Sequence, residues 1–377
     1  MKKLILAFGV FVLIVMPVFG QFSIGGIVET HGLLALGDSE EDEITTRGGW
    51  GFELSVTLEN LAETAGATAA LVDGTSIWAY GWWRPTNRLF LKSGDIFRNS
   101  TWAEGDITCW GFHANYFYIT RPTESFAGIL RPGHGFFLPT MVLGRDPAMQ
   151  ITLTPINALT LNIAFPFQTG GSRNTFADTY WGHLHAQLVY EFAGIGEAAF
   201  SFINGPDSNN PEIAAQRFFF QWKMPLGDNM RMEFGVNYDL PGQRATSPIV
   251  NHPDRPINLG LGWGMGNLEN DDQMVINARF GAAIPMVDTQ PTRLGLEVLF
   301  SYDLDILRLY VPAGLGFILP ASGDPLVTWS FAPYIARNLF GPWLYIGFNI
   351  VGITSSAIEN VFIWSIPIGM RWEFSRR

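Results

Sequence analysis

The sequence predicts an all-β fold, a transmembrane antiparallel up-and-down β-barrel of about 16–18 strands. Polar and apolar residues alternate along much of the chain, which is typical of strands because successive side chains point to opposite faces. Charged residues are only 15% of the 377 residues, against roughly 25% in ordinary soluble proteins. The chain also begins with an export signal. Together these observations favour an exported sheet that needs little charge on its outer surface.

The export signal occupies residues 1–20. Lys2 and Lys3 precede an apolar run, and Val18 and Gly20 stand three residues and one residue before a cleavage site. A membrane anchor is the alternative, but the run is short for a span of about 20 residues. We expect removal of residues 1–20, with residues 21–377 forming a single barrel.

Composition excludes several function classes. The formal net charge of −11 argues against a nucleic-acid partner. A single cysteine, Cys109, permits neither a disulfide framework nor a CxxC site. No GxSxG, HExxH or P-loop motif is present. We therefore predict a protein that is not an enzyme and that has no cofactor and no metal site.

The clearest hairpin lies in residues 216–239. Even positions on both sides of the turn at 225–229 are large and apolar, and odd positions are mostly polar. Two alternating runs joined by a short turn predict a β-hairpin. The same alternation recurs in 152–165, 183–192, 274–284, 292–303, 343–351 and 362–374.

Short and longer connections alternate after residue 150. The short ones are 155–157, 193–196, 225–229, 303–305 and 338–341, and the longer ones are 167–181, 205–214, 240–255, 285–291 and 319–325. Outer-membrane barrels have short periplasmic turns and longer outer loops. The pattern places the end of the last strand on the short-turn side, with about five strands before residue 148 and roughly 13 after it.

Alternation alone does not decide which face meets water. A soluble sandwich turns its apolar face inward, whereas a transmembrane barrel turns it outward to lipid. The export signal, the low charge and strand segments that suit a span of about 9–11 residues favour the barrel. Aromatic residues near strand ends predict interfacial belts. These are Trp78, Tyr80, Trp82, Trp83, Trp343, Tyr345, Trp364 and Trp372.

The last segment carries a family resemblance. Apolar residues alternate along 362–374 and end in Met370, Trp372 and Phe374. The chain resembles bacterial outer-membrane porin-type β-barrels, whose terminal aromatic strand is recognised by the barrel-assembly machinery. The resemblance implies that these three residues are the assembly signal, although Ser375, Arg376 and Arg377 follow them. It further implies an outer-membrane location, contact with outer-membrane lipid and a homotrimer.

Two sets of charged or polar residues are candidate site residues. The first would line a pore: Arg217, Lys223, Arg231, Glu233, Asn237, Asp239, Arg279, Arg293, Glu297, Arg371 and Glu373. The alternative is that these charged residues pair across strands and only keep the inner face of the barrel wall hydrated. The second lies in the irregular segment 93–148, which is either an outer loop or, as in porins, a loop folded inward as a constriction. Its candidate residues are Arg98, Glu104, Asp106, Arg121, Arg131 and Arg145.

The function predicted from these features is a porin that lets small hydrophilic solutes or ions diffuse passively. Two alternatives remain open. One is a plugged or narrow barrel that acts as a receptor, an adhesin or a channel for hydrophobic substrates. The other is an exported soluble all-β binding protein.

Overall fold

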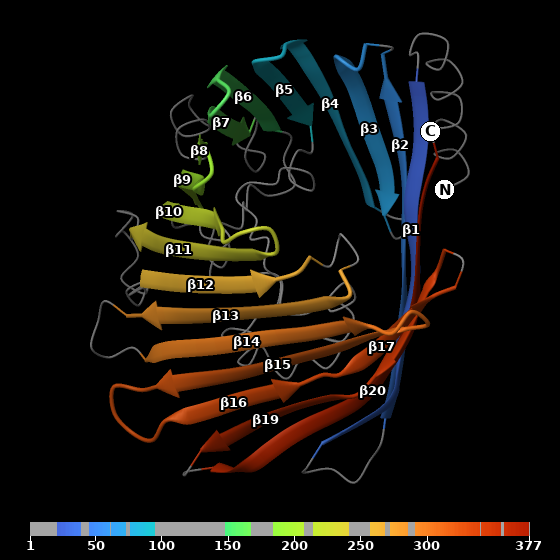
Figure 1. Ribbon diagram of the computed structural model, residues 1–377, viewed down its shortest axis with the longest axis vertical. Helices are drawn as coiled ribbons and strands as arrows, with labels where there is room; N and C mark the ends of the chain where they lie inside the picture. Colours follow the sequence, from blue (N-terminus) through green and yellow to red (C-terminus); the bar gives the residue numbers. More distant parts are fainter. Residues whose placement is uncertain are drawn as a thin grey trace.

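The sheet closes on itself to form a ring. The computed structural model describes residues 21–38, 45–60, 62–72, 76–94, 148–166, 184–206, 214–240, 257–267, 272–285, 291–339, 341–355 and 358–376. In these ranges, twenty strand segments form one sheet, and the first, β1, pairs antiparallel with the last, β20. Figure 1 shows β1 and β20 side by side where the ring closes.

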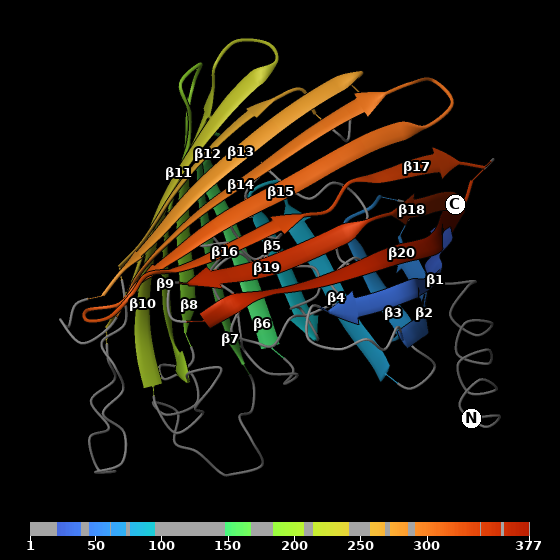
Figure 2. The ribbon, with the colours of Figure 1, turned by 90° about the horizontal axis from the view of Figure 1, so that it is seen from below.

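The segments follow one another along the chain and pair mainly with their sequence neighbours. Their bounds are β1 Gln21–Asp38, β2 Thr45–Glu59, β3 Ala65–Val72, β4 Ser76–Thr86, β5 Leu89–Gly94, β6 Ala148–Ile156, β7 Leu159–Pro166, β8 His185–Phe192, β9 Gly196–Pro206, β10 Ala214–Pro225, β11 Met230–Leu240, β12 Ile257–Met265, β13 Met274–Ile284, β14 Thr292–Asp303, β15 Arg308–Leu319, β16 Leu326–Phe331, β17 Tyr334–Asn338, β18 Trp343–Gly347, β19 Asn349–Ser355 and β20 Ile358–Arg376. Figure 2 shows β12 to β15 running side by side at a common slant.

Two pairs of segments are interrupted single strands. Both β16 and β17 pair with β15, and both β18 and β19 pair with β20. The register is the same on both sides of the interruption, with Phe331 opposite Ile350 and Tyr334 opposite Gly347. The break follows from Pro333, which has no N–H to donate to the ladder. The wall therefore has eighteen strands, as predicted at the upper end of the expected range.

Most of the short connections lie at one end of the barrel. The connections at this end join β2 to β3, β4 to β5, β6 to β7, β8 to β9, β10 to β11, β12 to β13, β14 to β15 and β17 to β18. The opposite end has two short connections as well, residues 73–75 and 356–357. Because every pair is antiparallel, the start of β1 and the end of β20 lie at the end with most of the short connections. The predicted direction of the last strand is confirmed.

The two faces of the sheet differ as a membrane barrel requires. On β11, the Phe234 side chain is 38% exposed and its neighbour Glu233 is 1% exposed. On β14, Leu296, Val298 and Phe300 are exposed, whereas Glu297 and Ser301 are buried. A closed sheet has an inside and an outside, so the buried polar face is the inner one. The outward direction of the apolar face is confirmed, which is the reverse of a soluble sandwich.

Among the residues with described side chains, the predicted aromatic belts are wrong for four. Tyr80 and Trp82 share a face with the buried Lys92, which lies opposite Trp82. Trp343 and Tyr345 lie opposite Arg371 and Gly369, also on the inner face. Position near a strand end does not determine the face, which depends on register. Adjacent residues must point to opposite sides.

Other aromatic residues do point outward. Trp83 is 54% exposed and Trp372 is 46% exposed. Trp372 packs beside Phe374, with ring centroids 5.2 Å apart. A Cβ atom on Gly26 of β1 would lie 2.8 Å from the Phe374 ring. Glycine at this position therefore lets the last strand lay its aromatic ring against the first.

No helix among the described residues has the length and apolar character needed to span a membrane.

Candidate functional site

A row of charged residues crosses the inner face of neighbouring strands. The cross-strand register places each of the following opposite the next: Glu191, Glu197, Lys223, Glu233, Gly262, Arg279 and Glu297. Glu191 and Glu197 flank the short turn between β8 and β9, whereas Glu297 lies in the middle of β14. The row therefore runs obliquely across the strands, from the end of the barrel with the short turns toward the middle of the wall.

Opposite charges face each other at the upper end of this row. Arg279 is 7% exposed and Glu297 is 5% exposed, and the two are direct cross-strand partners. Opposite charges in such positions stabilise a sheet, and like charges destabilise it. Lys223 likewise stands between Glu197 and Glu233. From Glu197 to Glu297 the charges alternate in sign, which has a structural reason in addition to any effect on solutes, whereas Glu191 lies opposite the like charge of Glu197.

A cavity of about 540 Å³ lies at the lower end of the row, among three short turns. Its charged lining residues are Glu191, Glu197, Asp228, Glu233, Asp272, Lys223 and Arg231. Arg231 Nη1 donates a hydrogen bond to the Gly266 carbonyl oxygen at 3.1 Å, which holds the guanidinium against the wall. Acidic groups outnumber basic ones at this mouth.

A chain of uncharged side chains crosses the inner face of β6 to β9. Thr152 Oγ1 donates to Asn162 Oδ1 at 2.7 Å, and Asn162 Nδ2 donates to Gln187 Oε1 at 3.0 Å. Gln187 Nε2 continues to Ser201 Oγ at 3.1 Å, and Gln150 Nε2 donates to Thr152 Oγ1 at 3.2 Å. The inner wall therefore contains a neutral hydrogen-bonded sector beside the charged one.

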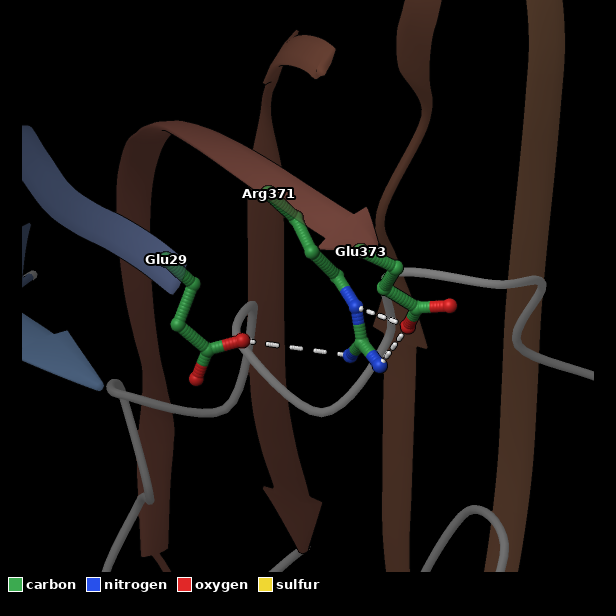
Figure 3. Close-up of polar contacts among 3 residues, drawn as sticks. All are labelled: Glu29, Arg371 and Glu373. Carbon is green, nitrogen blue, oxygen red and sulfur yellow. Dashed lines mark hydrogen bonds and ion pairs between the residues drawn. The ribbon is translucent and has the colours of Figure 1, made fainter. Parts of the chain in front are cut away.

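A third polar group crosses the closing pair of strands (Figure 3). Arg371 Nη1 of β20 lies 3.8 Å from Glu29 Oε2 of β1, and Arg371 Nε donates to Glu373 Oε1 at 2.7 Å. A Cβ atom on Gly51 of β2 would lie 2.7 Å from Glu29 Oε1, so glycine leaves room for the carboxylate. The group links the first strand to the last.

Most predicted pore-lining residues do lie on the inner face. Those with described side chains are Lys223, Arg231, Glu233, Arg279, Arg293, Glu297, Arg371 and Glu373. Arg217, Asn237 and Asp239 occupy inward positions in the register, and their side chains lie outside the description. The predicted constriction residues Arg98, Glu104, Asp106, Arg121, Arg131 and Arg145 and the signal segment 1–20 lie outside the described residues.

The predicted pore-lining residues include one amide, Asn237, and leave out four other amides of the inner wall. These amides stand at the polar positions of strands whose polar and apolar residues alternate as clearly as in the strands with charged residues. They are Gln150, Asn162, Gln187 and Gln221. The alternation of polar and apolar residues could therefore have identified these amides, but the pore-lining residues were predicted mainly from their charge. In the described ranges, no three His, Cys, Asp or Glu side chains gather into a metal site.

Comparison with solved structures identifies the architecture. The barrel superposes on OpdL of Pseudomonas aeruginosa with a TM-score of 0.58, covering 95% of this chain and 99% of that one at 11% identity. The chain has the fold of outer-membrane channels. OpdQ of the same organism gives a TM-score of 0.55, covering 94% and 98% of the two chains at 11% identity. OpdK, determined with vanillate, gives 0.54, covering 95% and 100% at 10% identity. No family model and no curated protein sequence matches the chain.

Proposed function

We propose that this protein is an outer-membrane channel through which small hydrophilic solutes or ions diffuse passively. The observation that carries the proposal is the inverted distribution of side chains on a closed wall. Charged and amide side chains face inward, and large apolar ones face outward. Barrels of 16–18 strands are wide enough to leave an aqueous channel, and the wall here has eighteen.

The cellular setting belongs to the same proposal. Residues 1–20 direct export and are removed, outer-membrane lipid covers the apolar face, and Met370, Trp372 and Phe374 serve the barrel-assembly machinery. A homotrimer is the proposed assembly. The fold is shared with channels of Pseudomonas aeruginosa, one of which was determined with vanillate. That likeness supports a solute channel rather than an enzyme.

Single-channel recording in a planar lipid bilayer tests the function directly. The refolded protein lacking residues 1–20 should give discrete current steps that scale with salt concentration. A control sample denatured by boiling should give none. Heat-modifiable gel mobility shows whether the barrel has folded. A folded, inserted protein that passes no current would contradict passive diffusion and support a plugged or receptor-type barrel.

A further inference from the structure

Aromatic rings line one part of the inner wall. Trp82 of β4 and Phe90 of β5 have ring centroids 6.3 Å apart at an interplanar angle of 32°. A Cβ atom on Gly66 of β3 would lie 2.5 Å from Trp82 Cζ2, so the indole ring covers a glycine on the wall. One face of the Trp82 indole therefore lies on the backbone of Gly66, and its other face is directed to the interior of the barrel.

The neutral hydrogen-bonded chain adjoins these rings. Phe90 lies opposite Thr152 in the register, and Thr152 begins the chain that passes through Asn162 to Gln187 and Ser201. Asn162 uses one donor and one acceptor in this chain, whereas a carboxamide carries two N–H donors and two acceptor lone pairs. Asn162 is half-buried, so its remaining capacity faces the interior.

An amide at the far end of this sector has polar atoms that no described group satisfies. Gln221 of β10 is 4% exposed and points inward from beside the Ser201 position. Within the described part of the chain, neither its Nε2 nor its Oε1 has a hydrogen-bond partner. A buried amide without a partner is costly. A polar ligand in this part of the interior would relieve that cost.

We propose that the patch of the inner wall formed by the Trp82 and Phe90 rings and the amides of Asn162, Gln187 and Gln221 binds uncharged saccharides. The C–H groups on a sugar ring carry partial positive charge, which is attracted to the negative face of an aromatic ring. Sugar hydroxyls both donate and accept, which matches the mixed capacity of carboxamides. The hydrogen-bonded chain itself contains no charged group, and the two cations beside it each contact an aromatic ring. Arg84 Cζ lies 5.4 Å from the centroid of Phe90, and Lys92 Nζ lies 4.2 Å from the centroid of Tyr80. The inference rests on the proposed channel function and names one substrate class for it.

Blockage of ion current by maltotetraose tests this proposal on the refolded barrel. The sugar should interrupt the current in a concentration-dependent way, and polyethylene glycol of similar size serves as the steric control. Trp82→Ala and Asn162→Leu should each weaken the apparent affinity about threefold to tenfold. Trp83→Ala is the matched control, because Trp83 is adjacent in sequence but points outward. Trp82→Phe keeps a ring and should retain most of the affinity.

Calorimetric titration of the detergent-solubilised barrel with maltotetraose separates the site from the channel. Current that maltotetraose and polyethylene glycol reduce equally, with no effect of Trp82→Ala, would overturn the saccharide site and leave the channel standing. Binding of the sugar that depends on Trp82, with no current, would support the site and overturn passive diffusion. Absence of both would overturn both proposals.

Discussion

At the scale of single residues, neighbours on one strand experience opposite surroundings. Glu233 is buried in the interior, and Phe234 beside it is exposed on the outer face. In a soluble protein, exposed phenylalanines at alternating strand positions would face water at a high cost. Here the outer face suits lipid, and the same residues become the membrane-facing surface. The cost of a substitution should therefore depend on the face more than on the strand.

Phe234→Arg should destabilise the folded barrel by about 2–4 kcal/mol, because it places a charge on the lipid face near the middle of a strand. The measurement is the free energy of unfolding in urea, with the protein refolded into lipid vesicles. Phe234→Leu is the matched control and should remain close to the wild type. Normal folding of Phe234→Arg together with failure of Glu233→Phe would show that the faces are reversed.

Arg279 and Glu297 should show strong mutual dependence. Arg279→Glu puts like charges opposite each other in a buried position, and breaking such a pair costs about 3–5 kcal/mol. Exchanging both, as Arg279→Glu with Glu297→Arg, restores opposite charges and should recover most of that loss. A double-mutant cycle on unfolding free energies measures the coupling. Additive effects of the two changes would mean that the pair does not stabilise the wall.

At the scale of elements, the strand pattern was largely predictable and the register was not. Alternation in 216–239 and 292–303 predicted the strands and their turns, because a period of two is a local property. The outer face was predicted only with the export signal and the low charge added to that pattern. The opposition of Arg279 and Glu297 depends on pairing between strands, which a single sequence does not contain. The same gap explains why Trp82 and Tyr345 were predicted on the wrong face.

Prolines mark a line of weaker pairing across the wall. Ala332 donates to the Pro312 carbonyl oxygen and Phe348 donates to the Pro333 carbonyl oxygen, but neither proline can donate in return. Pro367 of β20 lies opposite Leu33 of β1, next to a shift in register. The line separates the β17–β18 hairpin from the rest of its strands. We expect this hairpin to open more readily than the strands around β14.

Pro333→Ala should slow local opening at this line. The new N–H can donate to the Phe348 carbonyl oxygen, which gains about 0.5–1.5 kcal/mol. The same change removes proline's restriction on the unfolded chain, which lowers the free energy of unfolding by about 0.4–1 kcal/mol. Global stability should therefore change little, while hydrogen–deuterium exchange slows in peptides covering 334–355. The peptide covering 292–303 is the internal control. Unchanged exchange around Phe348 would contradict the proline explanation.

At the scale of the whole molecule, the inner wall is divided into sectors. The uncharged hydrogen-bonded chain crosses β6 to β9, and the charged row runs from the turn ends of β8 and β9 to the middle of β14. Inward aromatic rings lie both on β4 and β5 and on β15 to β18. A row of glycines also crosses five neighbouring strands: Gly235, Gly260, Gly281, Gly295 and Gly316. These positions add no side chain to the interior. The closed wall thus combines bare backbone with two kinds of polar surface.

Two cysteines on opposite faces of β10 would test whether water fills this interior. In a Cys109→Ser background, Lys223→Cys introduces a thiol on the inner face, and Phe220→Cys places one on the lipid face. In protein inserted in a planar bilayer, a charged, membrane-impermeant methanethiosulfonate should modify position 223 quickly and position 220 slowly, because only the former meets water. Modification at 223 should also change the single-channel conductance. Equal rates at both positions, or no change in current after complete labelling of 223, would contradict a water-filled lumen bounded by β10.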